Sequence, residues 1–193
     1  HAILQYPLFE NIKNNPPQRC YLCKKQIFTA ILEEAEKRRY NDVVDGTNID
    51  DYQDIRPGIK ALRELEIKNP LAEANLGKGD IRRCSKEMGL PTWDKPAYAC
   101  LLSRLPFNTS IRQEVLNRIE KAEGLIRNAG FPASRVRTHG GIARIEIPPE
   151  KLQEFMQKSF KLKLAQKIKD LGYQYVTLDL EGYKMGSFNE PEN

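Results

Sequence analysis

The feature that most constrains the fold is a stretch of alternating charged and apolar residues in the second half of the chain. Residues 134–138 and 141–147 are predicted to be two short strands around a His-Gly pair. Helical periodicity predicts a helix over residues 110–128 before them and another over about 150–170 after them. A last strand is expected over residues 173–178. This order of elements, α-β-β-α-β, predicts a compact α+β domain.

Charged residues repeat with a period of two on the two central strands. A hairpin would therefore gather three guanidinium groups and one carboxylate on one face: Arg135, Arg137, Arg144 and Glu146. One interpretation is a solvated face with cross-strand ion pairs, each contributing about 0.2–1 kcal/mol. The other is a binding site for a phosphate or carboxylate, which arginine holds through two parallel hydrogen bonds. The residues alone leave both interpretations open.

The first half of the chain is predicted to begin with a long helix. Apolar residues at helical spacing follow a pair of cysteines: Ile27, Phe28, Ile31, Leu32 and Ala35. Val43 and Val44 are expected to form a short buried strand that leads into a sharp turn at Asp45-Gly46-Thr47-Asn48. A strand that ends in such a loop is the usual place for a ligand in an open α/β sheet.

The sharpest chemical signal is a pair of cysteines at a loop-to-helix junction. Cys20 and Cys23 have the C-x₂-C spacing that lets two thiolates bind one metal ion or one cluster. Cys100 lies 77 positions after Cys23, in a stretch without clear periodicity. Because the chain has no second C-x₂-C, a four-cysteine zinc ribbon is excluded. The remaining interpretations are a redox dithiol, an iron–sulfur cluster with one open iron, a zinc site of three cysteines completed by His1 or His139, and a spacing that arises by chance.

Cys84 is assigned to packing rather than to chemistry. It falls within a helix predicted from an N-cap at Asp80 to Met88, with Gly89 as the stop. A cysteine in such a helix behaves as a small apolar residue, so Cys84 is expected in the core. Four cysteines are too few for a disulfide scaffold, and reduced thiols are expected.

Composition excludes several classes of protein. No apolar run is long enough to span a membrane, and no signal peptide opens the chain, so a cytoplasmic location is expected. The net charge of +5 and the pI of about 9.0 suit an anionic small molecule or a phosphate. No basic, aromatic-studded face of the kind that binds RNA is present. The first residues, from His1 onward, resemble the interior of a domain sequence rather than its beginning, and we expect a segment to precede them.

Several motifs spread over nearly the whole chain resemble one known family. They are Asn15-Pro16-Pro17-Gln18-Arg19-Cys20-Tyr21-Leu22-Cys23, Asp45-Gly46-Thr47-Asn48, Arg56-Pro57-Gly58, Gly89-Leu90-Pro91-Thr92-Trp93-Asp94-Lys95-Pro96, Cys100-Leu101-Leu102-Ser103-Arg104, Arg135-Val136-Arg137, Ile142-Ala143-Arg144-Ile145-Glu146 and Tyr175-Val176-Thr177-Leu178-Asp179-Leu180. Together they resemble the LarE family of ATP-dependent sulfur transferases, which make the nickel-pincer nucleotide cofactor of lactate racemase.

The resemblance implies a fold in two parts. LarE-like proteins have an N-terminal ATP pyrophosphatase domain of the PP-loop type, which is similar to adenine nucleotide α-hydrolases. It opens with a Ser-Gly-Gly-x-Asp-Ser loop, and that loop is absent from this sequence. The implied fold class is α/β: residues 1–107 as the C-terminal part of an incomplete PP-loop domain, and residues 108–193 as a small α+β domain for sulfur transfer and oligomerisation.

The resemblance also implies a reaction. ATP, with Mg²⁺, adenylylates a carboxylate of pyridinium-3,5-dicarboxylate mononucleotide, and sulfur then displaces AMP to leave a thiocarboxylate. Some members sacrifice a cysteine of their own as the sulfur source, whereas others hold a [4Fe-4S] cluster on three cysteines. Ala99 stands at the position of the sacrificial cysteine. The chain therefore resembles the cluster type, with Cys20, Cys23 and Cys100 as ligands.

Residues from both halves of the chain would form the site. The resemblance implies four catalytic residues: Cys100, Ser103, Arg104 and Glu123. It implies four residues that bind the substrate and the adenine nucleotide: Arg135, Arg137, Asp45 and Asn48. A homo-oligomer, as a hexamer, is expected, without a membrane or nucleic-acid partner. Two alternatives remain, a PP-loop enzyme that thiolates tRNA and a non-catalytic fragment assembled around zinc or a cluster.

Overall fold

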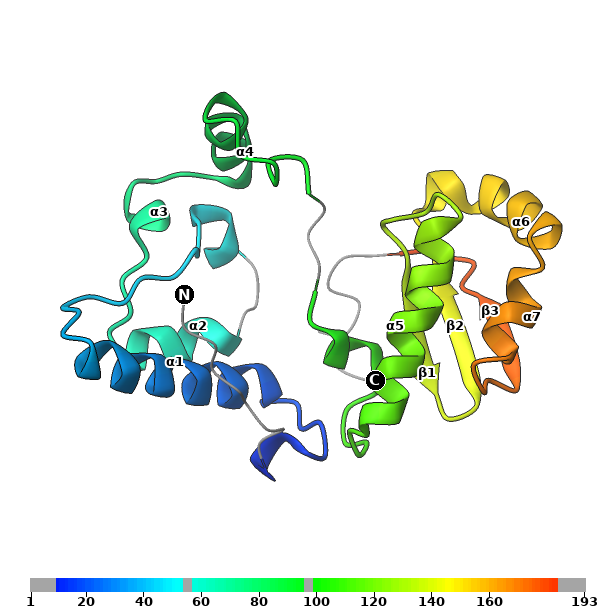
Figure 1. Cartoon of the computed structure of the whole chain (residues 1–193), viewed down its shortest axis with the longest axis horizontal. Helices are drawn as coiled ribbons and strands as arrows, with labels where there is room; N and C mark the ends of the chain where they lie inside the picture. Colours follow the sequence, from blue (N-terminus) through cyan, green and yellow to red (C-terminus); the bar gives the residue numbers. More distant parts are fainter. Residues whose placement is uncertain (1–9, 54–56, 96–98, 184–193) are drawn as a thin grey trace. The chain divides into compact units, whose positions relative to one another are not determined.

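The computed structural model describes residues 10–53, 57–95 and 99–183 (Figure 1). The chain divides into two compact units, residues 1–95 and 96–193. The Cys100–Arg104 segment belongs to the second unit, whereas the sequence-based division placed it in the first domain. Within the described ranges, no helix is long and apolar enough to cross a membrane.

The first unit is mostly helical. Its elements are η1 (Glu10–Ile12), α1 (Arg19–Lys37), η2 (Ile49–Tyr52), α2 (Pro57–Glu64), α3 (Pro70–Glu73) and α4 (Lys78–Glu87). Figure 1 shows α1 and α2 side by side. The helices approach closely at Gly58, where an added Cβ would lie 2.9 Å from the Lys24 side chain. The helix predicted to follow the cysteine pair exists as α1, but it begins at Arg19 and so includes Cys20 and Cys23.

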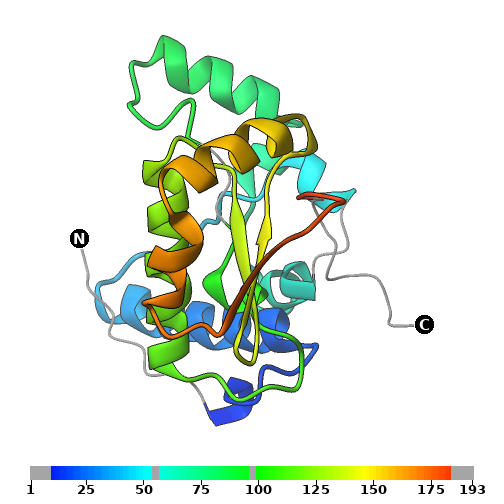
Figure 2. The same cartoon turned by 90° about the vertical axis from the view of Figure 1, so that its right-hand side faces the viewer.

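The second unit is an α+β domain. Its elements are η3 (Leu101–Arg104), α5 (Gln113–Asn128), β1 (Arg135–His139), β2 (Ile142–Glu146), η4 (Pro149–Lys151), α6 (Leu152–Lys161), α7 (Leu164–Lys169) and β3 (Tyr175–Leu178). The sheet has the order β1-β2-β3, with β1 antiparallel and β3 parallel to β2. Figure 2 shows the β1–β2 hairpin beside α5 and α7. The mixed helix and strand order predicted from the sequence is confirmed.

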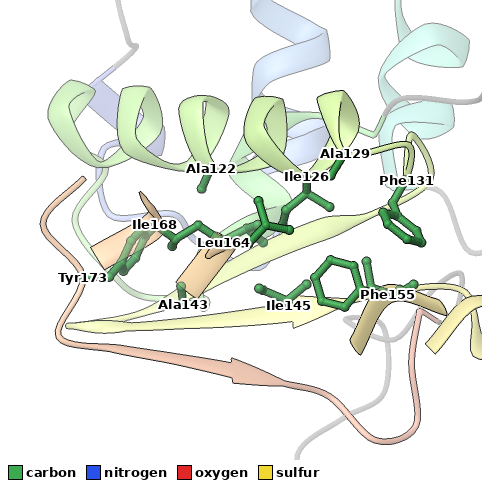
Figure 3. Packing of buried hydrophobic residues seen from close by; sticks show 12 residues of the cluster. Ala122, Ile126, Ala129, Phe131, Ala143, Ile145, Phe155, Leu164, Ile168 and Tyr173 are labelled. Atoms are coloured by element: carbon green, nitrogen blue, oxygen red, sulfur yellow. The ribbon is translucent and has the colours of Figure 1, made fainter. Parts of the chain in front are cut away.

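The core of the second unit lies between the helices and one face of this sheet (Figure 3). In the antiparallel register Val136 lies opposite Ile145, and both side chains are buried. Helix α5 contributes Ala122 and Ile126 to the same cluster, because its apolar residues recur at helical spacing. The other face of the hairpin therefore carries the charged residues of the period-two pattern.

Three local predictions were wrong. The expected helix over residues 150–170 is divided into α6 and α7 at Lys163, whose φ of 51° is left-handed. The expected buried strand at Val43 and Val44 is reduced to a single parallel bridge between Val44 and Lys68, which no further strand residues flank in the described part of the chain. Val44 is 59% exposed. Cys84 is exposed rather than in the core, because α4 is rich in charged residues and buries none of its side chains.

The start of α4 also differs from the expectation. Asp80 was predicted as the N-cap, but the helix begins at Lys78, and Asp80 is its third residue. The Asp80 carboxylate accepts a hydrogen bond from the Gly77 amide at 3.2 Å, so it still stabilises the beginning of the helix.

Candidate functional site

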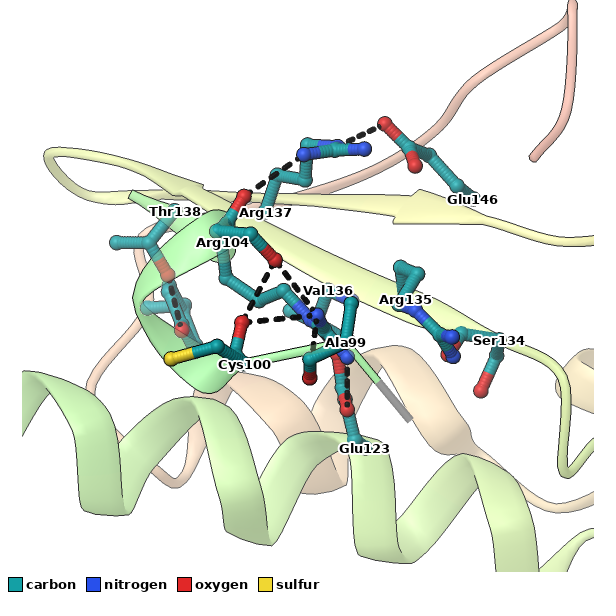
Figure 4. Close-up of polar contacts among 12 residues, drawn as sticks. Ala99, Cys100, Arg104, Glu123, Ser134, Arg135, Val136, Arg137, Thr138 and Glu146 are labelled. Carbon is teal, nitrogen blue, oxygen red and sulfur yellow. Dashed lines mark hydrogen bonds and ion pairs between the residues drawn. The ribbon is translucent and has the colours of Figure 1, made fainter. Parts of the chain in front are cut away.

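Cys100 lies at the start of η3, and its backbone is tightly held (Figure 4). The Cys100 carbonyl accepts hydrogen bonds from the Ser103 amide at 2.9 Å and the Ser103 hydroxyl at 2.7 Å. A third donor, Nη1 of Arg104, lies 3.3 Å from the same oxygen. The residue itself is exposed, and in Figure 4 its sulfur points away from the Arg104 guanidinium. The turn thus presents a thiol on a fixed backbone.

Arg104 and Glu123 form a buried ion pair behind this turn. The guanidinium Nε and Nη2 donate to the two carboxylate oxygens of Glu123 at 2.7 and 3.2 Å. The Arg104 side chain is only 2% exposed and the Glu123 side chain 8%. Glu123 Oε1 also accepts the Val136 amide of β1 at 3.0 Å. The carboxylate therefore joins η3, α5 and β1 at one point.

A second buried pair lies on the charged face of the hairpin. Arg137 donates through Nε to Glu146 and through Nη1 to the Ser103 carbonyl at 2.8 Å. Arg144 shares the same Glu146 oxygen at 3.1 Å and lies 3.6 Å from Asp179. Burial lowers the pKa of the Arg137 guanidinium, and the Glu146 carboxylate opposes that effect. The cross-strand ion pairs foreseen from the sequence exist, but most of this face is buried rather than solvated.

Arg135 completes the set of arginines on this face. It is 4% exposed, donates to the Ser134 carbonyl at 2.8 Å and lies 4.8 Å from the ring centre of Tyr183. At the end of β1, partial burial and the positive charges of Arg144 and Arg137 lower the pKa of His139. His139 is therefore held neutral near pH 7.

The predicted nucleotide loop lies in the first unit and is internally ordered. Asp45 accepts hydrogen bonds from the Thr47 amide, at 2.7 Å, and from the Thr47 hydroxyl. Burial opposes the charged form of Asp45, but the Thr47 hydrogen bonds and the Lys24 ammonium, 3.3 Å away, hold its pKa below the usual value. Asn48 donates to Asp51 from its amide and its side chain, at 3.2 and 2.8 Å. The loop thus has a defined backbone.

The three predicted cluster ligands are divided between the two units. Cys20 and Cys23 lie near the beginning of α1, three residues apart and so on one face of the helix. Cys20 is exposed and Cys23 half-buried, and none of the four cysteines is in a disulfide. Cys100 lies in the other unit. Among the described residues no three His, Cys, Asp or Glu side chains form a metal-binding group, so the joint ligand set stays a prediction.

Within the second unit, five of the predicted site residues converge on one region: Cys100, Ser103, Arg104, Glu123 and Arg137. The sequence analysis put Glu146 on the face shared with the arginines but did not list it as a site residue, and the observed register pairs it with Arg135. The pairing of Arg104 with Glu123 joins residues 19 positions apart and has no local sequence signal. His1, considered as a zinc ligand, lies outside the described residues.

Comparison with known proteins decides the family. No family model matches the chain. Over 187 residues it is 36% identical to the pyridinium-3,5-bisthiocarboxylic acid mononucleotide synthase of Lactiplantibacillus plantarum, LarE, and the match covers 97% of this chain and 67% of that protein. The chain belongs to the LarE family.

Two further relatives match most of the chain. An uncharacterized protein of Synechocystis, slr1717, is 44% identical over 179 residues, which cover 93% of this chain and 67% of that protein. An uncharacterized protein of Methanocaldococcus jannaschii, MJ0830, is 39% identical over 175 residues, which cover 91% and 68%. This LarE-family chain therefore spans about two thirds of the length of these relatives.

Proposed function

We propose that this chain carries out ATP-dependent sulfur insertion into pyridinium-3,5-dicarboxylate mononucleotide. The observation that carries the proposal is the Cys100 turn, which presents an exposed cysteine and is joined through Ser103 to the buried Arg137, in a chain of the LarE family. The relative from Lactiplantibacillus plantarum is named for a bisthiocarboxylic acid mononucleotide product. The arginines on the charged face of the hairpin suit that chemistry, because guanidinium groups bind phosphate and carboxylate groups of a nucleotide.

The reaction begins with activation of a carboxylate. A carboxylate oxygen of the substrate attacks the α-phosphorus of ATP, in the presence of Mg²⁺, and pyrophosphate leaves. The new bond joins the acyl group to AMP. We assign Asp45 and Asn48 to the adenine nucleotide, because their loop is already ordered by Thr47 and Asp51. Such an ordered loop binds a nucleotide with little further loss of conformational freedom.

In the second stage sulfur replaces the AMP group. A carbon–sulfur bond forms at the acyl carbon, the bond to the AMP oxygen breaks, and AMP leaves with its electron pair. We assign Arg135 and Arg137 to holding the substrate phosphate, with Ser103 beside Cys100. This arrangement orients the acyl carbon toward the sulfur source. Repetition at the other carboxylate gives the bisthiocarboxylate.

A [4Fe-4S] cluster on Cys20, Cys23 and Cys100 is the proposed sulfur source. Three thiols outside any disulfide, two of them on one face of the beginning of α1, fit such a ligand set. When bound, the cluster would supply a sulfide from the iron that no cysteine ligates.

The first test measures iron and product in the same preparation. After anaerobic reconstitution, the protein is expected to hold about four iron and four sulfide ions per chain. Cys20→Ala, Cys23→Ala or Cys100→Ala should each abolish the cluster, whereas the control Cys84→Ala retains it, since Cys84 is not one of the three proposed ligands. With ATP, Mg²⁺ and substrate, AMP and thiocarboxylate should appear together. Tightly bound zinc without iron, or AMP without a thiocarboxylate, contradicts the proposal.

A further inference from the structure

The backbone around Cys100 is held by more donors than a short turn requires. A 3₁₀ turn supplies one hydrogen bond to the Cys100 carbonyl, here from the Ser103 amide at 2.9 Å. The Ser103 hydroxyl and Nη1 of Arg104 donate to the same oxygen, and Nη1 also donates to the Ala99 carbonyl at 3.2 Å. The side chains of Ser103 and Arg104 thus restrain this backbone segment beyond the single hydrogen bond of the 3₁₀ turn.

Arg104 can hold these carbonyls because Glu123 fixes the other edge of its guanidinium. Two of the three guanidinium nitrogens, Nε and Nη2, face the Glu123 carboxylate. The group is planar, so fixing those two nitrogens also fixes the direction of Nη1. Glu123 is in turn held by the Val136 amide of β1. A continuous set of contacts therefore runs from α5 and β1 to the backbone of Cys100.

We propose that Arg104 and Glu123 are positioning residues, which act through the backbone of Cys100 and do not contact the substrate. All three guanidinium nitrogens of Arg104 and both oxygens of Glu123 are already engaged within the protein. This role differs from the direct catalytic contact that the family resemblance implies. The predicted effect of Arg104 and Glu123 on the reaction rate rests on the proposed sulfur transfer. Their contacts with the backbone of Cys100 do not depend on that proposal.

The first experiment measures the position of Cys100 without any reaction. The full chain is treated with a chelator and a reductant, and alkylation by iodoacetamide is followed at each cysteine by peptide mass spectrometry. Exposed Cys84 in the first unit serves as the internal reference. In Arg104→Met and Glu123→Gln the rate at Cys100 relative to Cys84 should differ about fivefold from that of the unmodified chain, as expected for the loss of one typical hydrogen bond.

A matched control and a milder variant complete this experiment. Glu120→Gln removes an exposed carboxylate from the same helix and should leave the ratio unchanged. If Arg104→Met or Glu123→Gln fails to fold, Ser103→Ala decides by the same measurement, because it removes one donor to the same carbonyl. A ratio equal to that of the unmodified chain in every folded variant overturns the proposal.

A second measurement distinguishes positioning from direct contact. In Glu123→Gln the kcat for sulfur transfer should fall about a hundredfold, as expected for a misplaced reacting group. The KM for the nucleotide substrate should stay unchanged. A KM that rises in step with the loss of kcat would identify a substrate contact and overturn the proposal. If the unmodified chain transfers no sulfur, the proposed function fails, and the alkylation ratio alone decides the role of the pair.

Discussion

The buried pair of Arg104 and Glu123 allows a quantitative prediction for stability. Removing one partner leaves an unpaired buried charge, so Arg104→Met and Glu123→Gln should each lower the free energy of unfolding by about 3–5 kcal/mol. The double variant contains neither charge and loses mainly the hydrogen bonds of Arg104 Nη1 to two carbonyls and one hydroxyl. At about 1 kcal/mol for each bond, it should lose only about 3 kcal/mol.

The expected interaction energy between the two substitutions is therefore at least about 3 kcal/mol. Urea unfolding followed by far-ultraviolet circular dichroism measures it, provided that the slope with urea is the same in all four proteins. The single tryptophan, Trp93, lies in the first unit, and its fluorescence distinguishes a loss in the second unit from collapse of the whole chain. If the loss of stability in the double variant equals the sum of the two single losses within about 0.5 kcal/mol, the reasoning is refuted, because substitutions at independent sites are additive.

Three further predictions concern other parts of the chain. Ile126→Ala removes a fully buried side chain from the core and should lower the free energy of unfolding by about 2–5 kcal/mol in a urea titration, with exposed Met156→Ala as the control. Asp45→Asn should be less stable than the parent above about pH 4. That difference should disappear as the pH falls through the lowered pKa of Asp45, which pH-dependent thermal unfolding will show. Arg135→Ala should weaken binding of a phosphate-bearing nucleotide by about tenfold in calorimetry; an unchanged Kd would return this arginine to a packing role.

The sequence predicted the second unit well because its signals are local. The alternation around His139 specifies a hairpin whose observed register pairs Val136 with Ile145. The apolar spacing of α5 likewise predicts which side of the helix is buried. The break at Lys163 was missed because a left-handed lysine has no characteristic neighbour pattern. Burial of Cys84 was wrongly expected because helical position alone does not say whether anything packs on that face.

The contacts of the candidate site were less predictable than its residues. Spacing placed the arginines on one face, but it did not show that Arg137 reaches the Ser103 carbonyl 34 positions earlier. Nor did it show that Arg104 turns toward Glu123 rather than toward solvent. Both facts depend on where η3 packs against β1, and packing between distant segments is not encoded in local periodicity.

The Glu123 carboxylate has a consequence for the sheet as well as for the turn. In the order β1-β2-β3, β1 is an edge strand, and the Val136 amide would be a free donor on that edge without Glu123. Free donors on an edge strand are the places where another chain can add a strand of its own. The same side chain that fixes the Cys100 turn therefore also removes one of the backbone donors through which another chain could pair with β1.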